Sequence, residues 1–308
     1  MRWARALLKS AVSLPLRTTG RLDRLDIGEF AYRSKRSLEA LCRARAQPVR
    51  LGDNEALCRI LGRYKLFVDT RDQGLGAHLL LDGFWELGLT MYMARTVRPG
   101  MAAIDVGANL GYYTILLGAL VGDRGHVYAI EPAPPTAAML RRSIRLNGYD
   151  DRTTVVEAAA GVSDGGEALL YVPHREPKNA AVVAAPEAAD PEAGTLYRVA
   201  EASIDALMAQ QQVDFIKIDA EGAEEAIVAG ALATLRRDKP ILVLEFNAAR
   251  SRDPGGLLAT LGAIYGPPHT LDLHGRLHAA TVAQLTGERV ASDWLLVFGS
   301  TPRVRRRA

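Results

Sequence analysis

The chain has 308 residues, of which 48% are apolar and 24% charged, and its formal net charge is +3. This composition is that of a globular chain of one or two domains, and it excludes a disordered acidic chain and a strongly basic nucleic-acid coat protein, so we expect no nucleic-acid partner. Two cysteines, Cys42 and Cys58, are too few for a disulfide scaffold or a multi-cysteine metal site.

Basic residues gather at both ends of the chain. Residues 3 to 14 carry apolar side chains on one helical face and Arg2, Arg5 and Lys9 on the other, which predicts a short helix that lies on a membrane surface or packs on its own domain. Lys9 interrupts any secretory signal, and the uncharged run from 106 to 122 is too short to span a bilayer. We expect a cytoplasmic protein, with peripheral membrane contact as one alternative. The other is an organellar transit peptide, because no acidic residue precedes Asp23.

Three regions are predicted along the chain: a basic, partly helical extension over 1–70, a main domain over 71–300 and a basic tail over 301–308. Within the main domain, strand and helix patterns alternate as in parallel βαβ units. The predicted strands are 102–106, 126–130, 153–156, 214–219 and 241–246, and the predicted helices between them are 112–120, 136–146, 203–210 and 224–236.

The remaining segments of the main domain complete a doubly wound sheet. A strand at 167–172 is followed by a proline-rich stretch, 173–194, which we expect to be an irregular surface excursion and part of a lid. After Pro254, a helix at 257–261 and strands at 269–273 and 294–298 would close an antiparallel edge.

A glycine-rich loop joins the first of these strands to its helix. Asp105, Gly107, Asn109 and Gly111 lie in this turn, where glycines allow a close approach of a ligand to the backbone. Glu131 ends the next strand, where it can accept hydrogen bonds from both hydroxyls of a ribose. The loop lacks the G-x-G-x-x-G pattern that binds a pyrophosphate, so the sequence favours S-adenosylmethionine over a dinucleotide.

Three segments together resemble the FkbM family of S-adenosylmethionine-dependent methyltransferases: 104–114 (IDVGANLGYYT), 130–132 (IEP) and 215–224 (FIKIDAEGAE). The resemblance runs from about residue 84 to 246 and more loosely to 298. It implies an α/β fold with a seven-stranded, mostly parallel sheet whose last strand is antiparallel, and methyl transfer to a hydroxyl group.

The resemblance also implies a cofactor site. The family positions that bind S-adenosylmethionine correspond to Asp105, Gly107, Ala108, Asn109, Gly111, Glu131, Pro132, Ala159 and Asp219. Asp105 would meet the ammonium of the methionine portion, and the stretch from Glu157 to Ala159 would border the adenine.

Two carboxylates at the end of a buried strand are the predicted catalytic residues. Asp219 and Glu221 are expected to face the cleft, with Glu221 as the base that takes the acceptor proton, whereas the alternative is that they cap the next helix. Two acids could also hold Mg²⁺, but the spacing names no third ligand, so the metal stays unknown. Lys217, inside the apolar strand, is expected to extend to an edge.

Residues outside these motifs are predicted to bind the acceptor. They are Glu86, which precedes the core, Glu245 at the end of a strand, and His174 with Arg175 and Lys178 in the proline-rich stretch, where the alternative is simple solvation.

The leading hypothesis is an O-methyltransferase that acts on a hydroxyl of a sugar, glycolipid or secondary metabolite, with a small-molecule or glycan acceptor as its partner. One alternative is a membrane-surface binding or assembly protein on an inactive methyltransferase fold. The other is a nicotinamide-dependent oxidoreductase, to which the missing dinucleotide motif is the objection. Acceptor and oligomeric state are not encoded in any motif we recognise.

Overall fold

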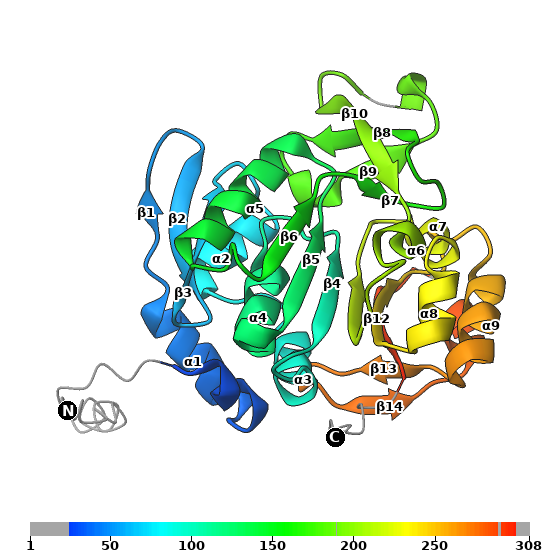
Figure 1. The fold of residues 1–308 in the computed structure, drawn as a ribbon. Coiled ribbons are helices and arrows are strands. Elements are labelled where there is room, and N and C mark those ends of the chain that lie inside the picture. Colours follow the sequence, from blue (N-terminus) through cyan, green and yellow to red (C-terminus); the bar gives the residue numbers. More distant parts are fainter. Residues whose placement is uncertain (1–24, 189, 289–290, 300–308) are drawn as a thin grey trace, which may run out of the picture.

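The computed structural model describes residues 25–188, 190–288 and 291–299, and its centre is a mostly parallel sheet (Figure 1). The strand order in this sheet is β14-β13-β15-β12-β11-β4-β5-β6. The strands are β4 (Ala102–Val106), β5 (His126–Ile130), β6 (Thr153–Val156), β11 (Phe215–Ile218), β12 (Ile241–Phe246), β13 (His269–Leu271), β14 (Leu277–Ala279) and β15 (Trp294–Phe298). The predicted fold is confirmed, with β15 antiparallel to both neighbours and the short β14 as an eighth, unforeseen strand.

Helices cover both faces of the sheet because successive strand residues point to opposite sides. Ala103 packs in one core with α3 (Leu87–Thr96), α4 (Tyr112–Val121) and α5 (Pro134–Leu146), whereas Ile104 packs in a second core on the opposite face. The second core contains residues of α6 (Ile204–Leu207), α7 (Glu224–Ala229), α8 (Leu232–Asp238) and α9 (Pro254–Tyr265). The chain is therefore doubly wound, as predicted.

One predicted helix, 224–236, is in fact two, α7 and α8, which are separated at Gly230. A side chain at Gly230 would collide with the carbonyl oxygen of Gly161, so the backbone passes closely there and the helix breaks.

The described part of the N-terminal extension shares the main core instead of standing apart. It contains the 3-10 turn η1 (Ile27–Ala31), α1 (Lys35–Arg45) and an unforeseen antiparallel sheet of β1 (Val49–Arg50), β2 (Glu55–Ile60) and β3 (Tyr64–Asp69). The next helix, α2 (Leu75–Asp82), begins the predicted main domain. Leu38 of α1 and Leu66 of β3 belong to the same buried cluster as Leu116 of α4. The predicted helix at 3–14 and the tail at 301–308 lie outside the described residues.

A second, smaller sheet lies over the carboxyl ends of the central strands, at the top of Figure 1. It is formed by β7 (Ala159–Ala160), β10 (Gly194–Ala202), β8 (Glu167–Pro173) and β9 (Ala181–Val183), in that order. The prediction of an irregular excursion over 173–194 is wrong in part, because β9 pairs with β8 inside that stretch. Prolines flank β9 at 177 and 186 and leave the strand itself free to pair.

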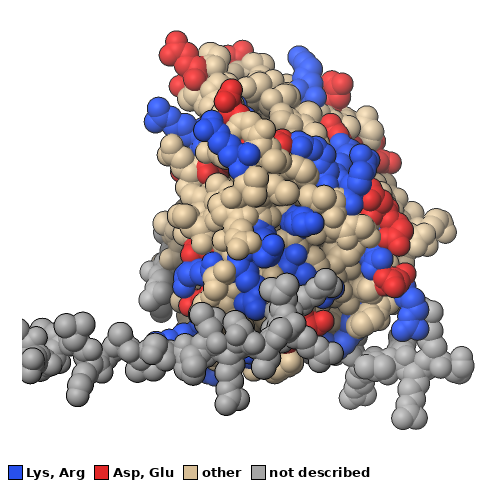
Figure 2. All heavy atoms as spheres, turned by 90° about the vertical axis from the view of Figure 1, so that its left-hand side faces the viewer, with Lys and Arg blue, Asp and Glu red and all other residues tan. Residues whose placement is uncertain are grey.

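Lys and Arg side chains are spread over the face that carries the N-terminal sheet (Figure 2). Part of their charge is balanced locally, because Arg142 pairs with Glu55 and Arg43 pairs with Asp82 at 2.7 Å. Among the described helices, none is long and apolar enough to cross a membrane. Membrane contact through residues 2–9 stays a prediction.

Candidate active site

A cavity opens at the carboxyl ends of β4, β5, β11 and β12, and the small sheet covers it. Seven of the predicted cofactor residues line it: Gly107, Ala108, Asn109, Glu131, Pro132, Ala159 and Asp219. Glu86, Glu221 and Glu245, predicted for acceptor binding or catalysis, line the same cavity. Residues far apart in sequence therefore meet where a doubly wound sheet places its ligand.

The loop after β4 is shaped by close backbone approach. Gly107 has φ of 70°, and a side chain there would collide with the carbonyl oxygen of Asp219, so only glycine fits. Gly111, with φ of 100°, caps α4 and lies beside Leu140, away from the cavity wall. The loop thus brings β4 against the end of β11 and leaves its backbone exposed toward the cavity.

Glu131 is a buried carboxylate with spare hydrogen-bonding capacity. Its Oε2 accepts the N–H of Asn109 at 2.8 Å, and its Oε1 accepts the N–H of Ala133 at 2.9 Å. Each oxygen keeps a second lone pair, which can accept a ribose hydroxyl. Burial raises the pKa of this carboxyl to about 7, despite the two backbone donors. The residues present therefore fit an adenosine ribose at this point.

Lys217 is buried, which corrects the prediction that its side chain extends to an edge. Its exposed fraction is 2%, and its ammonium lies 3.6 Å from Oδ1 of Asp105 and 3.1 Å from Oδ2 of Asp219. The ammonium also faces the ring of Tyr113 at 4.9 Å from the centroid. Burial alone would lower the pKa of Lys217, but the two aspartates raise it, so the lysine is charged.

Asp105 lies beneath the cavity and does not line it. It is fully buried, accepts the hydroxyl of Thr114 at 2.7 Å and pairs with Lys217. The ammonium beside Asp105 is therefore that of Lys217, where the sequence led us to expect that of a ligand. Asp219, by contrast, does line the cavity, and Lys217 holds its pKa below the usual range although burial acts in the opposite direction.

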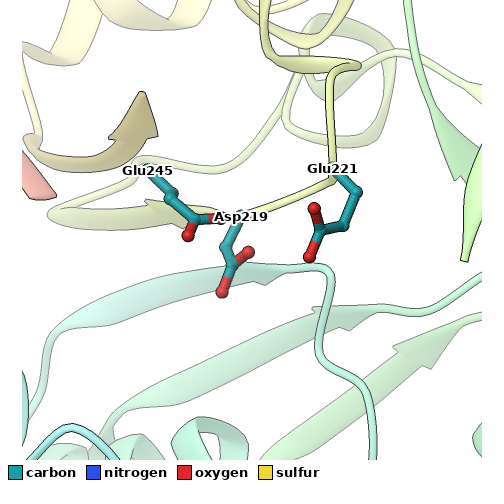
Figure 3. A group of neighbouring side chains, drawn as sticks. All are labelled: Asp219, Glu221 and Glu245. Atoms are coloured by element: carbon teal, nitrogen blue, oxygen red, sulfur yellow. The ribbon is translucent and has the colours of Figure 1, made fainter. Parts of the chain in front are cut away.

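Asp219, Glu221 and Glu245 converge from the ends of β11 and β12 (Figure 3). One carboxylate oxygen from each lies within 4.8 Å of the others, so Glu245 supplies the third oxygen donor that the spacing could not name. Such a set could ligate a divalent cation, but Arg250 pairs with Glu221 and Lys217 pairs with Asp219, so two of the three acids already have cationic partners.

The three acids have different protonation behaviour. Burial and the charge of Asp219 raise the pKa of Glu245, which therefore holds a proton near neutral pH. Burial also raises the pKa of Glu221, although Arg250 opposes the shift. Arg250 pairs with Asp293 as well, and this second pair fixes the guanidinium beside Glu221.

Strained backbone marks the cavity. Among the described residues, five non-glycine residues have positive φ, and Glu86 (36°), Asn109 (51°) and Glu221 (47°) all line this one cavity. Such conformations cost free energy and persist where the surrounding structure enforces them, which is common at functional sites. Glu86 is further held by Tyr113, whose hydroxyl donates to its Oε2 at 2.6 Å, and burial raises the pKa of Glu86.

Two residues predicted from the sequence, His174 for the acceptor and Glu157 for the adenine, lie outside the cavity wall. His174 is exposed, its ring nitrogen lies 3.1 Å from the hydroxyl oxygen of Thr195, and it does not line the cavity. Glu157 pairs with Arg141 at 2.5 Å, and it is Ala159 that reaches the cavity wall. Sequence reasoning missed Tyr113 and Arg250. Tyr113 lies within the segment 104–114, but nothing in that pattern gives it a role, and Arg250 lies outside the three segments.

The sheet order and the loop with its following acid define the class I, Rossmann-like methyltransferase fold. A family model described as the methyltransferase FkbM domain matches residues 105–277, more than half of the chain. The chain belongs to the FkbM methyltransferase family.

Curated relatives match over shorter stretches. A protein-L-isoaspartate O-methyltransferase of Hyperthermus butylicus is 34% identical over 96 residues, which is 29% of this chain and 36% of the relative. The enzyme of the same name from Aeropyrum pernix is 39% identical over 90 residues, 29% of this chain and 33% of the relative. The chain thus spans about a third of the length of these relatives.

Solved structures are similar at lower identity. The crystal structure of a methyltransferase FkbM from Methylobacillus flagellatus is 18% identical, with 69% of this chain and 53% of that chain covered and a TM-score of 0.42. Fibrillarin of Aeropyrum pernix, with natively bound S-adenosyl-L-methionine, is 12% identical, with 82% and 96% covered and a TM-score of 0.37.

Replacement of Lys217 by methionine should destabilise the protein strongly, because the fully buried Asp105 and the cavity-lining Asp219 would lose their shared cation. Breaking a buried ion pair typically costs about 3–5 kcal/mol. Urea unfolding of Lys217→Met measures this loss, with Lys65→Met on β3 as the control, since Lys65 is an exposed strand lysine. Equal stability of the two variants would contradict the structural role of the buried cation.

Cofactor affinity should depend on pH through Glu131. Its pKa of about 7 in the free protein means that the carboxyl is protonated below pH 7 and ionised above it. If ribose hydroxyls bind only the carboxylate, the affinity for S-adenosylhomocysteine at pH 6 should be about tenfold weaker than at pH 8. Calorimetry at both values measures this difference.

The matched variant is Glu131→Gln, which keeps the shape of the side chain and cannot ionise. It should bind S-adenosylhomocysteine more weakly by about 1–3 kcal/mol at pH 8 and lose the pH dependence between 6 and 8. A variant that keeps the wild-type pH profile would show that another group is responsible.

Proposed function

We propose that this protein transfers the methyl group of S-adenosylmethionine to a hydroxyl oxygen of a sugar, a glycolipid or another secondary metabolite. The observation that carries the proposal is that one cavity combines the loop of Gly107 and Asn109, the buried Glu131 and the acids of β11 and β12. The loop and Glu131 fit an adenosine. The acids follow the ends of β11 and β12, where an acceptor would reach the bound cofactor.

Different parts of the cavity would bind the cofactor and exclude water during such a transfer. S-adenosylmethionine supplies a methyl group on a positively charged sulfur. Glu131 would accept hydrogen bonds from the ribose hydroxyls, and the exposed backbone of the loop at Gly107 would lie against the nucleoside. Alignment of the two reacting groups accounts for most of the rate gain in a displacement of this kind, and the covering small sheet would exclude water.

Glu221 is the proposed base. Glu245 holds a proton, and Lys217 keeps the pKa of Asp219 below its usual range, whereas burial raises the pKa of Glu221. Glu221 is therefore the acid of the three whose carboxylate is best suited to receive the acceptor proton. Burial keeps its pKa above that of an exposed glutamate, which brings it closer to neutral pH and makes it a better proton acceptor. Arg250 would hold the side chain in place during the transfer.

Oxygen as the acceptor atom has support from the comparisons. The curated relatives carry the name protein-L-isoaspartate O-methyltransferase, and they match over stretches of 66 to 96 residues in the first three cases. These stretches are too short to transfer their acceptor to this chain. An isoaspartyl peptide therefore belongs in the acceptor screen beside the carbohydrates.

The proposed activity is tested by incubation of the full chain with S-adenosyl-[methyl-³H]methionine and four acceptor classes. These are simple methyl glycosides, a glycolipid extract, an aromatic alcohol and an isoaspartyl peptide. Alkali-stable label in a glycoside or glycolipid supports the proposal. Label in the peptide alone, or no label in any class, contradicts the proposed acceptor.

Glu221→Gln should lower kcat by about 10²- to 10⁴-fold, the usual contribution of a general base, while the affinity for S-adenosylhomocysteine stays within twofold. The control is Glu167→Gln, an exposed glutamate on β8. Steady-state kinetics with the acceptor found in the screen gives kcat, and turnover of Glu221→Gln at the wild-type rate would reject Glu221 as the base.

A further inference from the structure

Lys178 lies in the cavity wall, and its side chain packs against Gly74, the residue that precedes α2. It lies in the 3-10 turn Pro177–Asn179 between β8 and β9, is half-buried and lines the cavity. Its stem crosses Gly74, where a Cβ would lie 2.9 Å from Cδ of the lysine and would collide with Cε. Glycine at position 74 therefore leaves the space that the lysine occupies.

A backbone contact fixes the same turn. The N–H of Gln73 donates to the carbonyl oxygen of Arg175 at 3.3 Å, so the connection between β8 and β9 is docked on the segment before α2. The lysine stem and this hydrogen bond act at adjacent positions, 73 and 74. Together they position Lys178 in the wall of the cavity that Glu86 and Glu221 also line.

Among the residues that the structure describes, the ammonium of Lys178 makes no direct ion pair and no hydrogen bond. The other lysine in the cavity wall, Lys217, is different because two aspartates pair with it. Three carboxylates have pKa values that the charge of Lys178 lowers, and each of them has another partner. Tyr113 donates to Glu86, Arg250 pairs with Glu221, and the N–H of Gly74 donates to Asp72 at 2.9 Å.

Electrostatics agrees with this placement. Burial is the main influence on Glu86 and Glu221 and raises both pKa values, and the charge of Lys178 acts against it at both. The charge of Lys178 therefore acts on both acids that line the cavity with it. A half-buried ammonium that makes no direct ion pair forms its strongest hydrogen bond with an anionic oxygen.

We propose that Lys178 is the anion-binding residue of this cavity and donates to a carboxylate carried by a ligand. The inference rests on the proposed function and adds a recognition residue to it. A carboxylate can come from two sources, the methionine portion of S-adenosylmethionine or an acidic group on the acceptor. Both present the same chemistry to the lysine.

The test is calorimetric titration of the full chain and its variants with probes that separate the two sources. S-adenosylhomocysteine carries the amino-acid carboxylate, and 5′-methylthioadenosine lacks it. D-glucuronate and methyl β-D-glucopyranoside, each added to the complex with S-adenosylhomocysteine, are an acidic and a neutral acceptor probe. The variants are Lys178→Met and Gly74→Ala, which displaces the lysine stem and keeps its charge. The control, Arg198→Met, removes one positive charge from the exposed face of β10.

If the cofactor is the source, Lys178→Met should bind S-adenosylhomocysteine at least tenfold more weakly and bind 5′-methylthioadenosine as the wild type does. If the acceptor is the source, the variant should keep its affinity for S-adenosylhomocysteine and lose that for D-glucuronate. In either case Gly74→Ala should weaken the same probe, and Arg198→Met should weaken none.

Two results would overturn the inference. One is that Lys178→Met binds every probe as the wild type does. The other is that it loses 5′-methylthioadenosine to the same degree as S-adenosylhomocysteine, since this would place the lysine at the nucleoside. Failure of the wild type to bind either adenosine compound would instead overturn the proposed function.

Discussion

The buried ammonium of Lys217 is the interaction on which the rest of the site depends. It lies between Asp105, on β4, and Asp219, just after β11, and so joins the two adjacent strands whose ends form the floor of the cavity. A buried cation and a buried carboxylate are stable only when they compensate one another. The cation therefore favours the ionised form of Asp219, and burial together with the charge of Asp219 raises the pKa of Glu245 and keeps it protonated.

This arrangement gives neighbouring carboxylates different roles although they have similar chemistry. Asp105 is fully buried and does not line the cavity, Asp219 lines the cavity and pairs with the same lysine, and Glu221 lines the cavity and is the base of the proposed transfer. Glu131, on the other side of the loop, is separated from this group and keeps lone pairs for a ligand. Differences in burial and in partners, more than differences in residue type, set these roles.

Much of the fold could be predicted because it follows local rules. The alternation of apolar strands with helices predicted the parallel sheet, and the strand-loop-acid spacing from Asp105 to Glu131 predicted a nucleoside site at the strand ends. The N-terminal sheet β1–β3 and the pairing of β9 with β8 escaped prediction. Both consist of short strands stabilised by contacts with distant segments, which sequence patterns do not record.

The same limit applies within the site. The position of Lys217 in an apolar strand was plain, but its buried state required knowledge that Asp105 and Asp219 lie on either side of it. Lys178 was noted among loop charges, whereas its fixed position depends on Gly74, about a hundred residues earlier in the chain. The role of a charged side chain depends on the residues that surround it in space, and the tertiary fold determines which residues these are.

The central claim is that the cavity at the ends of β4, β5 and β11 is a binding site for the adenosine and amino-acid parts of S-adenosylmethionine. Calorimetric titration of the full chain with S-adenosylhomocysteine, and separately with NAD⁺, tests it most directly because neither requires knowledge of the acceptor. The account predicts one site of micromolar affinity for S-adenosylhomocysteine and no binding of NAD⁺. Binding of NAD⁺ alone, or of neither compound, would contradict it.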